Sequence, residues 1–485
     1  MNRKKEFVDF IAELLNLLYF PGREGEYLMT QKKELIKDLT TGSVPKTLIR
    51  FSFPLLLSGL LQMVYNMVDM IVVGQFVGTQ GLSAVSIGGE VLQLITFVAM
   101  GFSNAGQIQI SRYVGENRRD KVGRMVGTLF TLMMSLAVVI MIIFLLTYKG
   151  IISWLNTPAE IYEYTRQYSI TCVWGIVFIY GYNLVSAVLR GMGDSRHPFQ
   201  FIAIASVINI VLDLLFVGPM HMGPMGAALA TVIGQAVSFI FAISLLYRNR
   251  EQIHFDFRPE HFRIYGDVIK PLLTLGIPMV IQSAAVTFSM LFVNSYINTY
   301  GTTAVAVTGV ARKLEGMIGV VSQAISSAGG AMVAQALGAG KIKRVPQIVY
   351  NALWIVAIPT AVFAVVTALK PEWLFGLFSS DPEVLAMAVS YIPVAMIQYL
   401  GACLRPANFA LINGSGNSRL NLTVALLDGI ICRIGLALLL GVVFNMGIFG
   451  FWYGNAFAGT VPFFIGSVYL YSGAWKSRAS VRAAD

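Results

Sequence analysis

Twelve long apolar segments run through most of the chain, and they restrict it to one kind of fold. Each segment holds at least about 20 mostly apolar residues, and a helix of that length crosses the ~30 Å hydrocarbon core of a bilayer. A membrane-spanning strand needs only about 10 residues and alternates in polarity, which these segments do not. We therefore predict an all-α polytopic membrane protein with twelve transmembrane helices. The expected spans are 47–76, 82–112, 123–147, 161–189, 198–219, 224–248, 270–299, 303–337, 345–369, 384–411, 419–443 and 447–472.

Charged side chains are too few to cover a water-exposed surface. They make up 12% of the chain and hydrophobic residues 56%, whereas a soluble globular protein carries roughly 25% charged residues. Most of the surface must therefore face other helices or lipid, so the bilayer is an expected partner. Cys172, Cys403 and Cys432 lie in apolar segments without the spacing of metal ligands, and we expect them to be buried as small apolar side chains.

The basic residues indicate how the chain is oriented. Lysine and arginine gather in alternate loops, which are cytoplasmic in membrane proteins, and the opposite loops hold few besides Lys149 and Lys370. This pattern predicts that both termini are cytoplasmic. It also explains the net charge of +10 without a nucleic-acid partner. The basic clusters lie before residue 47, at 118–121, 190–196, 248–270 and 341–344, at Arg419, and after residue 475.

The two halves of the chain repeat each other. The motif RGMGDSR, starting at Arg190, returns as NGSGNSR, starting at Asn413, at a shift of 223 residues. The stretch AGQIQISRYVGENRRDKV from Ala105 returns as AGGAMVAQALGAGKIKRV from Ala328 at the same shift. FPLLLSGLL with Pro54, near the start of the first expected helix, resembles IPMVIQSAA in the seventh. We therefore predict two pseudo-symmetric six-helix lobes with a cavity between them. The expected divisions are a cytoplasmic tail 1–46, an N-lobe 47–248, a linker 249–269, a C-lobe 270–472 and a C-terminal tail 473–485.

Several polar side chains of the N-lobe share one depth in the membrane. Asp69 lies about seven residues before the outer end of its helix, and Asp213 about six before the outer end of another. Thr231 lies about seven residues past the outer start of a helix that runs the other way. Asn209 precedes Asp213 by four residues and shares its helix face. Such a cluster of oxygen atoms suits a small hard cation or a shared proton; the alternative is that Asn209 and Asp213 only hydrogen-bond neighbouring helices.

The C-lobe carries ionisable residues of a different kind. Arg312 and Glu315 are spaced to pair on a helix surface, and Asp428 and Arg433 could pair less directly. These residues either fix helix packing or line the cavity and meet the substrate, and Arg405 is expected to support the lobe interface. The candidate cavity residues are Glu90, Asn183, Arg312, Glu315, Arg405, Asp428 and Arg433.

Enzyme signatures are missing from the chain, so we expect no enzyme activity and no cofactor. There is no HExxH motif, no GxxxxGK[ST] phosphate-binding loop and no serine nucleophile elbow. Residues 7–20, FVDFIAELLNLLYF, are too short to span a bilayer. We expect them to form either an interfacial amphipathic helix or part of a dispensable tail.

Residues 40–475 resemble the MATE family of multidrug and toxic-compound extruders. The resemblance lies in FPLLLSGLLQMVYNMVDMIVVGQFVG, in SVINIVLDLLFV and in the paired loops RGMGDSR and INGSGNSR. It implies a monomer in the bacterial inner membrane that exports small organic, cationic molecules by antiport against Na⁺ or H⁺. It also implies that Asp69, Asn209, Asp213 and Thr231 form the site for the coupling ion, with the backbone carbonyl of Ala227 as a further oxygen. The seventh expected helix has no acidic residue within 272–299, unlike that of some family members, so we expect no coupling through the C-lobe.

Two other functions compete with antiport. Lipid-linked oligosaccharide flippases of the same superfamily line their cavity with basic residues, and Arg312, Lys313, Arg405 and Arg433 would suit that role. A membrane-embedded enzyme is the other alternative, and the missing motifs argue against it.

Overall fold

The structure is a computed structural model that describes residues 35–155 and 157–479. The chain divides between Leu35 and Ile36, and every contact reported below lies within residues 36–479. The helix expected over residues 7–20 lies outside the described residues, together with most of the N-terminal tail and the last six residues.

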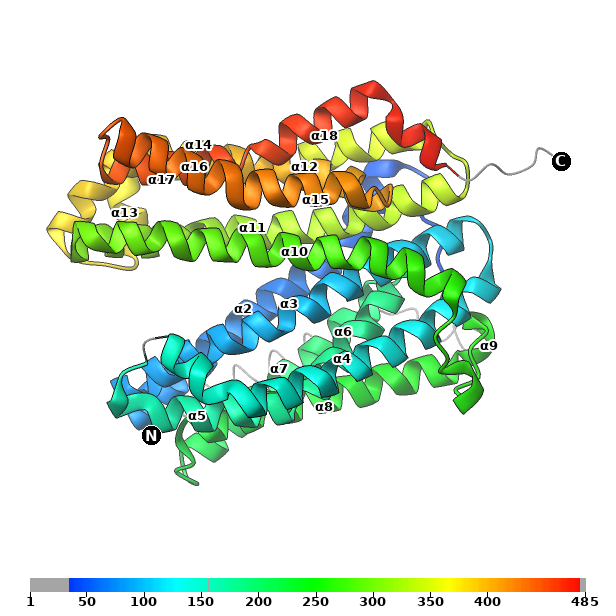
Figure 1. Cartoon of the computed structure of the whole chain (residues 1–485), viewed down its shortest axis with the longest axis horizontal. Coiled ribbons are helices and arrows are strands. Elements are labelled where there is room, and N and C mark those ends of the chain that lie inside the picture. Colours follow the sequence, from blue (N-terminus) through cyan, green and yellow to red (C-terminus); the bar gives the residue numbers. More distant parts are fainter. Residues whose placement is uncertain (1–34, 156, 480–485) are drawn as a thin grey trace, which may run out of the picture. The chain divides into compact units, whose positions relative to one another are not determined.

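The described residues are almost entirely helical (Figure 1). The first half contains α2 (Val44–Val77), α3 (Thr79–Gly115), α4 (Arg119–Trp154), α5 (Ala159–Trp174), α6 (Ile176–Gly191), α7 (Arg196–Val217) and α8 (Gly223–Arg248). The linker forms α9 (Arg250–Ile253) and the 3₁₀ turn η1 (Pro259–His261). The second half contains α10 (Gly266–Ile297), η2 (Asn298–Tyr300), α11 (Thr302–Gly338), α12 (Arg344–Leu369), α13 (Pro371–Gly376) and α14 (Pro382–Gly414). It ends with α15 (Ser418–Leu426), η3 (Leu427–Cys432), α16 (Arg433–Leu438), η4 (Leu439–Val443), α17 (Ile448–Ala458), α18 (Val461–Ser472) and η5 (Ala474–Arg478).

The prediction of twelve spans is confirmed within the described part of the chain. Eleven helices there are long and apolar enough to cross a membrane, and α5 with α6 form a twelfth span that is bent by 50°. The bend falls at Gly175, between the two helices. Glycine is a common position for a helix to kink, because it has no side chain to hold the preceding turn.

Each half packs mainly on itself, and a few helices join the halves. In Figure 1, α2–α8 (blue to green) lie beside one another, and α10–α18 (green to red) form a second group. The contacts between the groups run chiefly from α3 to α10 and α11, and from α2 to α11 and α12. Pro54 and Pro278 lie inside α2 and α10, not at their first turns. Because α2, α3, α10 and α11 take part in the contacts between the two groups, the cavity expected between the halves must lie beside these helices.

Candidate ion-coupling site and central cavity

Three helices of the first half bring together the polar residues expected at one depth. Asp69 comes from α2, Asn209 and Asp213 from one face of α7, and Thr231 from α8. All four are buried, and Asp213 has no exposed surface. Asn209 Nδ2 donates a hydrogen bond of 3.3 Å to Thr231 Oγ1. Asp69 lies within interaction range of Asp213 and Thr231, so the side chains that were grouped by depth do meet.

Several oxygen atoms of this cluster have no partner. Asp69 Oδ1, Asn209 Oδ1 and both carboxylate oxygens of Asp213 are buried and accept no hydrogen bond. A buried oxygen without a donor costs roughly 1–3 kcal/mol, and more when it is charged. Two neighbouring carboxylates are also strongly disfavoured together in a low dielectric unless a cation or a proton compensates them. The cluster therefore has the donor atoms for Na⁺ or for a proton.

An apolar shell surrounds this oxygen cluster. Val72, Val73, Tyr168 and Cys172 belong to one buried group of side chains, which also includes Ala227. Ala227 is fully buried one turn before Thr231 on α8. Because these apolar side chains lower the local dielectric, the charges beside them interact more strongly than they would in water.

Gln235 is a member of this region that the sequence analysis missed. It lies one turn after Thr231 on α8, is buried, and leaves its Oε1 atom without a partner. Its spacing of four residues from Thr231 would have placed it on the same helix face. Tyr65 was also missed; it lies one turn before Asp69 on α2, and Gln62 Nε2 lies 3.4 Å from its hydroxyl. Gln235 therefore adds a further unpaired oxygen beside the cluster.

A central cavity lies between the two halves and touches the cluster. The cavity has two compartments, which we call its lobes, with volumes of about 490 Å³ and about 240 Å³. Met100, Asn104, Gln323 and Ser327 line both lobes, so the two spaces are contiguous. Thr231 lines the larger lobe and also belongs to the oxygen cluster. An ion bound in the cluster would therefore lie next to the space that can hold a substrate.

The wall of this cavity is rich in amide and apolar side chains. Among the described residues that line either lobe, Arg190 alone carries a formal charge at neutral pH. Its Nε donates a 2.7 Å hydrogen bond to Gln107 Oε1, and Gln107 Nε2 donates to the carbonyl oxygen of Ser327, at 3.0 Å. This chain of contacts runs from α6 through α3 to α11 and so joins the two halves. Asn183 was predicted to line the cavity, and it does so from α6.

Most of the other predicted cavity residues lie elsewhere. Glu90 is exposed on α3 and lines neither lobe. Arg312 and Glu315 line a separate crevice in the second half, beside Tyr391 and Trp452. The ion pair that Arg312 and Glu315 are spaced to form is not among the ion pairs of the described residues.

Asp428 and Arg433 form a buried ion pair because their helix changes its winding. Arg433 Nη2 lies 2.8 Å from Asp428 Oδ1, and neither residue is more than 2% exposed. Five residues of α-helix turn the side chain by about 140°, which would separate the two groups. The intervening segment η3 is a π-helix, whose wider turn aligns residues five apart. The pairing is therefore direct, and it lies inside the second half, not on the cavity wall.

Arg405 contacts its own half of the molecule. Its Nη2 lies 3.4 Å from the carbonyl oxygen of Gly459, and its Nε is buried without a partner. This contact does not reach α2–α8, so it gives no support to the expected role of Arg405 at the lobe interface.

The second half lacks a copy of the acidic cluster. At the repeat shift of the first and seventh spans, Val293 takes the place of Asp69. Within residues 35–155 and 157–479, no group of three or more His, Cys, Asp or Glu residues could hold a metal ion. The oxygen cluster of the first half, with two carboxylates and neutral oxygens, is thus suited to a monovalent ion and not to a transition metal.

Comparisons with known proteins agree with a fold built from two similar halves. The family model MatE matches residues 54–215 and 278–455, one segment in each half. The probable multidrug resistance protein YpnP of Bacillus subtilis is 27% identical over 355 residues, covering 73% of this chain and 79% of YpnP. YoeA of the same organism, also a probable multidrug resistance protein, is 28% identical over 77% of this chain and 81% of its own. A solved structure of a multidrug resistance MATE transporter in an outward-facing conformation has the same fold, with a TM-score of 0.85 at 22% identity, over 93% of this chain and 100% of that one.

Proposed function

Because the chain belongs to the MatE family of multidrug efflux transporters, we propose that it is a secondary antiporter. An organic molecule leaves the cytoplasm through the central cavity while Na⁺ or H⁺ enters. Family members are multi-pass membrane transporters, not enzymes, and the twelve spans agree with that. The observation that carries the proposal is the set of unpaired buried oxygens of Asp69, Asn209 and Asp213 beside the cavity.

The coupling ion acts through the position of α2, α7 and α8. Without an ion, the carboxylates of Asp69 and Asp213 repel each other, which favours a looser packing of α2 against α7. A bound Na⁺ or proton removes that repulsion and favours the tighter packing. An ion can shift the conformational equilibrium only by the difference between its affinities for the two states. Thr231, which faces both the ion site and the cavity, is where a change of packing alters the substrate space.

The substrate that we propose is an amphiphilic organic cation of low charge density. The cavity presents the rings of Tyr65 and Tyr182 and amide groups such as those of Gln62 and Asn183, and aromatic faces and amide oxygens can hold such cations without a full negative charge. If one monovalent substrate exchanges for one monovalent ion, no net charge moves. Moving one elementary charge through 100 mV changes the free energy by about 2.3 kcal/mol, and this contribution cancels when two equal charges exchange. The ion gradient alone then drives export.

The chain is proposed to act as a monomer in a bacterial inner membrane. Its basic residues lie in every second loop between the spans, for example at Arg118, Arg248 and Lys343. Because such loops are cytoplasmic, this pattern predicts that both termini are cytoplasmic. Each half contributes helices to one cavity, so a single chain contains the complete transport path.

Positions of the basic residues argue against a lipid-linked oligosaccharide flippase. That alternative depended on Arg312, Lys313, Arg405 and Arg433 lining the cavity, and none of them lines either lobe. Arg433 is already neutralised by Asp428. A single guanidinium, that of Arg190, is a weak match for a pyrophosphate.

The test is transport by the purified protein in sealed vesicles. A fluorescent organic cation is loaded, and Na⁺ and H⁺ gradients are imposed separately. We expect one of the two gradients to drive accumulation against the concentration gradient of the dye, and Asp213→Asn to abolish it. Equal transport with and without both gradients would remove the proposal of antiport.

A further inference from the structure

Residues 37–42, which lie just before the N-cap of α2 at Ser43, cross from one half of the molecule to the other. They precede the residues that the family model matches, which begin at residue 54, and their backbone is not helical. We call this segment, Lys37 to Gly42, the strap. It contacts the turn between α6 and α7 on one side and the end of α11 with the start of α12 on the other.

Lys37 attaches the strap to the first half. Its backbone N–H donates a 2.8 Å hydrogen bond to the carbonyl oxygen of Met192, and its Nζ lies 3.0 Å from Asp194 Oδ1. Gly193 lies between these two contacts with φ of +85°, and a Cβ there would lie 2.8 Å from the carbonyl oxygen of Lys37. The strap thus approaches the turn more closely than any other residue type at position 193 would permit.

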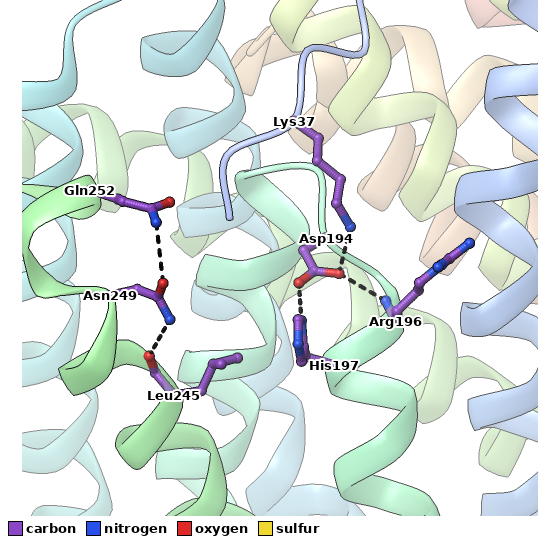
Figure 2. A network of polar contacts seen from close by, with 7 residues as sticks. All are labelled: Lys37, Asp194, Arg196, His197, Leu245, Asn249 and Gln252. Atoms are coloured by element: carbon purple, nitrogen blue, oxygen red, sulfur yellow. Dashed lines mark hydrogen bonds and ion pairs between the residues drawn. The ribbon is translucent and has the colours of Figure 1, made fainter. Parts of the chain in front are cut away.

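Asp194 is the centre of a polar network (Figure 2). Its Oδ1 also accepts the backbone N–H of Arg196, at 3.0 Å, and its Oδ2 contacts His197 Nδ1. Burial alone would raise the pKa of Asp194, but His197 and the Lys37 ammonium together lower it to about 2. The carboxylate that Lys37 meets is therefore a buried, ionised group that Arg196 and His197 also hold in place.

Side chains of three residues of the second half, Gln335, Lys341 and Arg344, attach residues 39–42 of the strap. Gln335 Oε1 accepts the N–H of Leu39 at 2.9 Å. Lys341 Nζ donates to the carbonyl oxygen and the hydroxyl of Thr40, at 3.1 and 2.6 Å. Arg344 donates to the carbonyl oxygens of residues 41 and 42, at 2.8 Å each. The side chain of Leu39 is 5% exposed and belongs to the apolar core that α11, α12 and α14 form. The strap is therefore bound more extensively to the second half than to the first.

The helix ends under the strap already touch. A Cβ at Gly115 of α3 would collide with the carbonyl oxygen of Gln335, and one at Gly338 of α11 with that of Arg112. Gln335 also holds the strap, so the strap covers the place where α3 and α11 meet. This end of the molecule carries the basic loops 118–121 and 341–344 and is the end proposed to face the cytoplasm.

We propose that the strap is a latch that holds the cytoplasmic ends of the two halves together and that opens at Lys37 and Asp194. This inference rests on the proposed export by alternating access, because substrate can enter from the cytoplasm only when these ends separate. The attachment to the first half is the one that breaks, since it consists of one backbone hydrogen bond and one ion pair whose lysine is 40% exposed. The repeated loop of the second half has Asn417 in place of Asp194, so only the first half can hold the lysine in this way.

Distances between spin labels test the latch without any transport. Cys172, Cys403 and Cys432 are replaced by alanine, and labels are attached through Arg119→Cys and Lys343→Cys, two exposed positions at the cytoplasmic ends of the two halves. The protein is measured in lipid nanodiscs without substrate or ion gradient. We expect Lys37→Met to raise the population with a long label-to-label distance, relative to the population with a short one, about fivefold. This factor corresponds to the largest stabilisation expected from a partly exposed ion pair. Lys46→Met removes the same charge from an exposed position of α2 and is the matched control.

A second set of variants separates a latch from general loosening. Lys341→Ala combined with Arg344→Ala frees the strap from the second half and should raise the same ratio. A latch is open once either of its ends is free. Combining these changes with Lys37→Met should therefore change the distance ratio little more than the larger single effect does. If the two attachments acted independently, their effects on the ratio would multiply. Unchanged distances in folded Lys37→Met protein, or fully multiplied effects, would overturn the latch. A clear shift together with a failure of ion-driven efflux would leave the latch standing and remove the proposed function instead.

Discussion

Replacing Asp213 by asparagine tests the coupling site directly. The substitution keeps the size of the side chain and one oxygen, but it removes a full negative charge from a position with no exposed surface. A cation about 4 Å from that charge loses roughly 4 kcal/mol at an effective dielectric constant of about 20, which corresponds to roughly a thousandfold weaker binding. An amide also cannot carry the proton of an H⁺-coupled cycle. We therefore expect gradient-driven dye transport to fall to the level of empty vesicles.

The assay follows dye accumulation in vesicles and, in parallel, the melting temperature of the protein with increasing Na⁺ concentration. A ligand that binds only the folded protein raises its stability by RT ln(1 + [L]/Kd), so wild-type protein that uses Na⁺ should be stabilised by it and the variant should not. Glu90→Gln is the matched control, because Glu90 is an exposed acid of α3 outside the cavity. Wild-type transport by folded Asp213→Asn protein would refute the reasoning.

Three further substitutions test other parts of the structure. Arg433→Met should lower the free energy of unfolding by about 3–5 kcal/mol, because it leaves Asp428 buried without its partner; a denaturant titration of the purified protein measures this, and adding Asp428→Leu should restore much of the loss. Gln235→Leu should weaken Na⁺ stabilisation less than Asp213→Asn does, since it removes one neutral oxygen beside the cluster; the same melting assay ranks the two variants. Because the pKa of Asp194 is lowered in the folded protein, its ionised form stabilises the fold by about 2 kcal/mol above about pH 4. This stabilisation is lost as the pH falls from about 4 to about 2. Asp194→Asn should remove that dependence, and an unchanged acid transition in this variant would contradict the assignment.

The span count and the acidic cluster were within reach of the sequence because both follow from local rules. The length and apolarity of a segment decide whether it can cross a bilayer, and a spacing of four residues places Asn209 and Asp213 on one face of α7. The depth of Asp69 and Thr231 needed only a count from the ends of their helices. None of these steps requires knowledge of which helices touch.

Other features depend on helix packing or on unusual winding and could not be predicted. The Asp428–Arg433 pair depends on a π-helical turn, which no spacing rule for an α-helix contains. Arg312 and Glu315 have the right spacing but do not pair in the described structure. His197 falls between the expected spans 161–189 and 198–219, yet it lies in the first turn of α7 and contacts Asp194.

Helix α7 connects the two ends of the proposed mechanism. Asp194 lies just before its first turn and Asp213 in its last turn but one. The helix rises about 26 Å from Arg196, its first residue, to Asp213, at 1.5 Å per residue. A packed helix moves largely as a rigid element, so a change of its position at the ion cluster also moves the turn that holds Lys37. The ion then biases the latch only to the extent that it binds one position of α7 more tightly than the other. An ion that loosens or tightens α7 against α2 in this way would control when the cytoplasmic end can open, although it binds near the opposite end of the same helix.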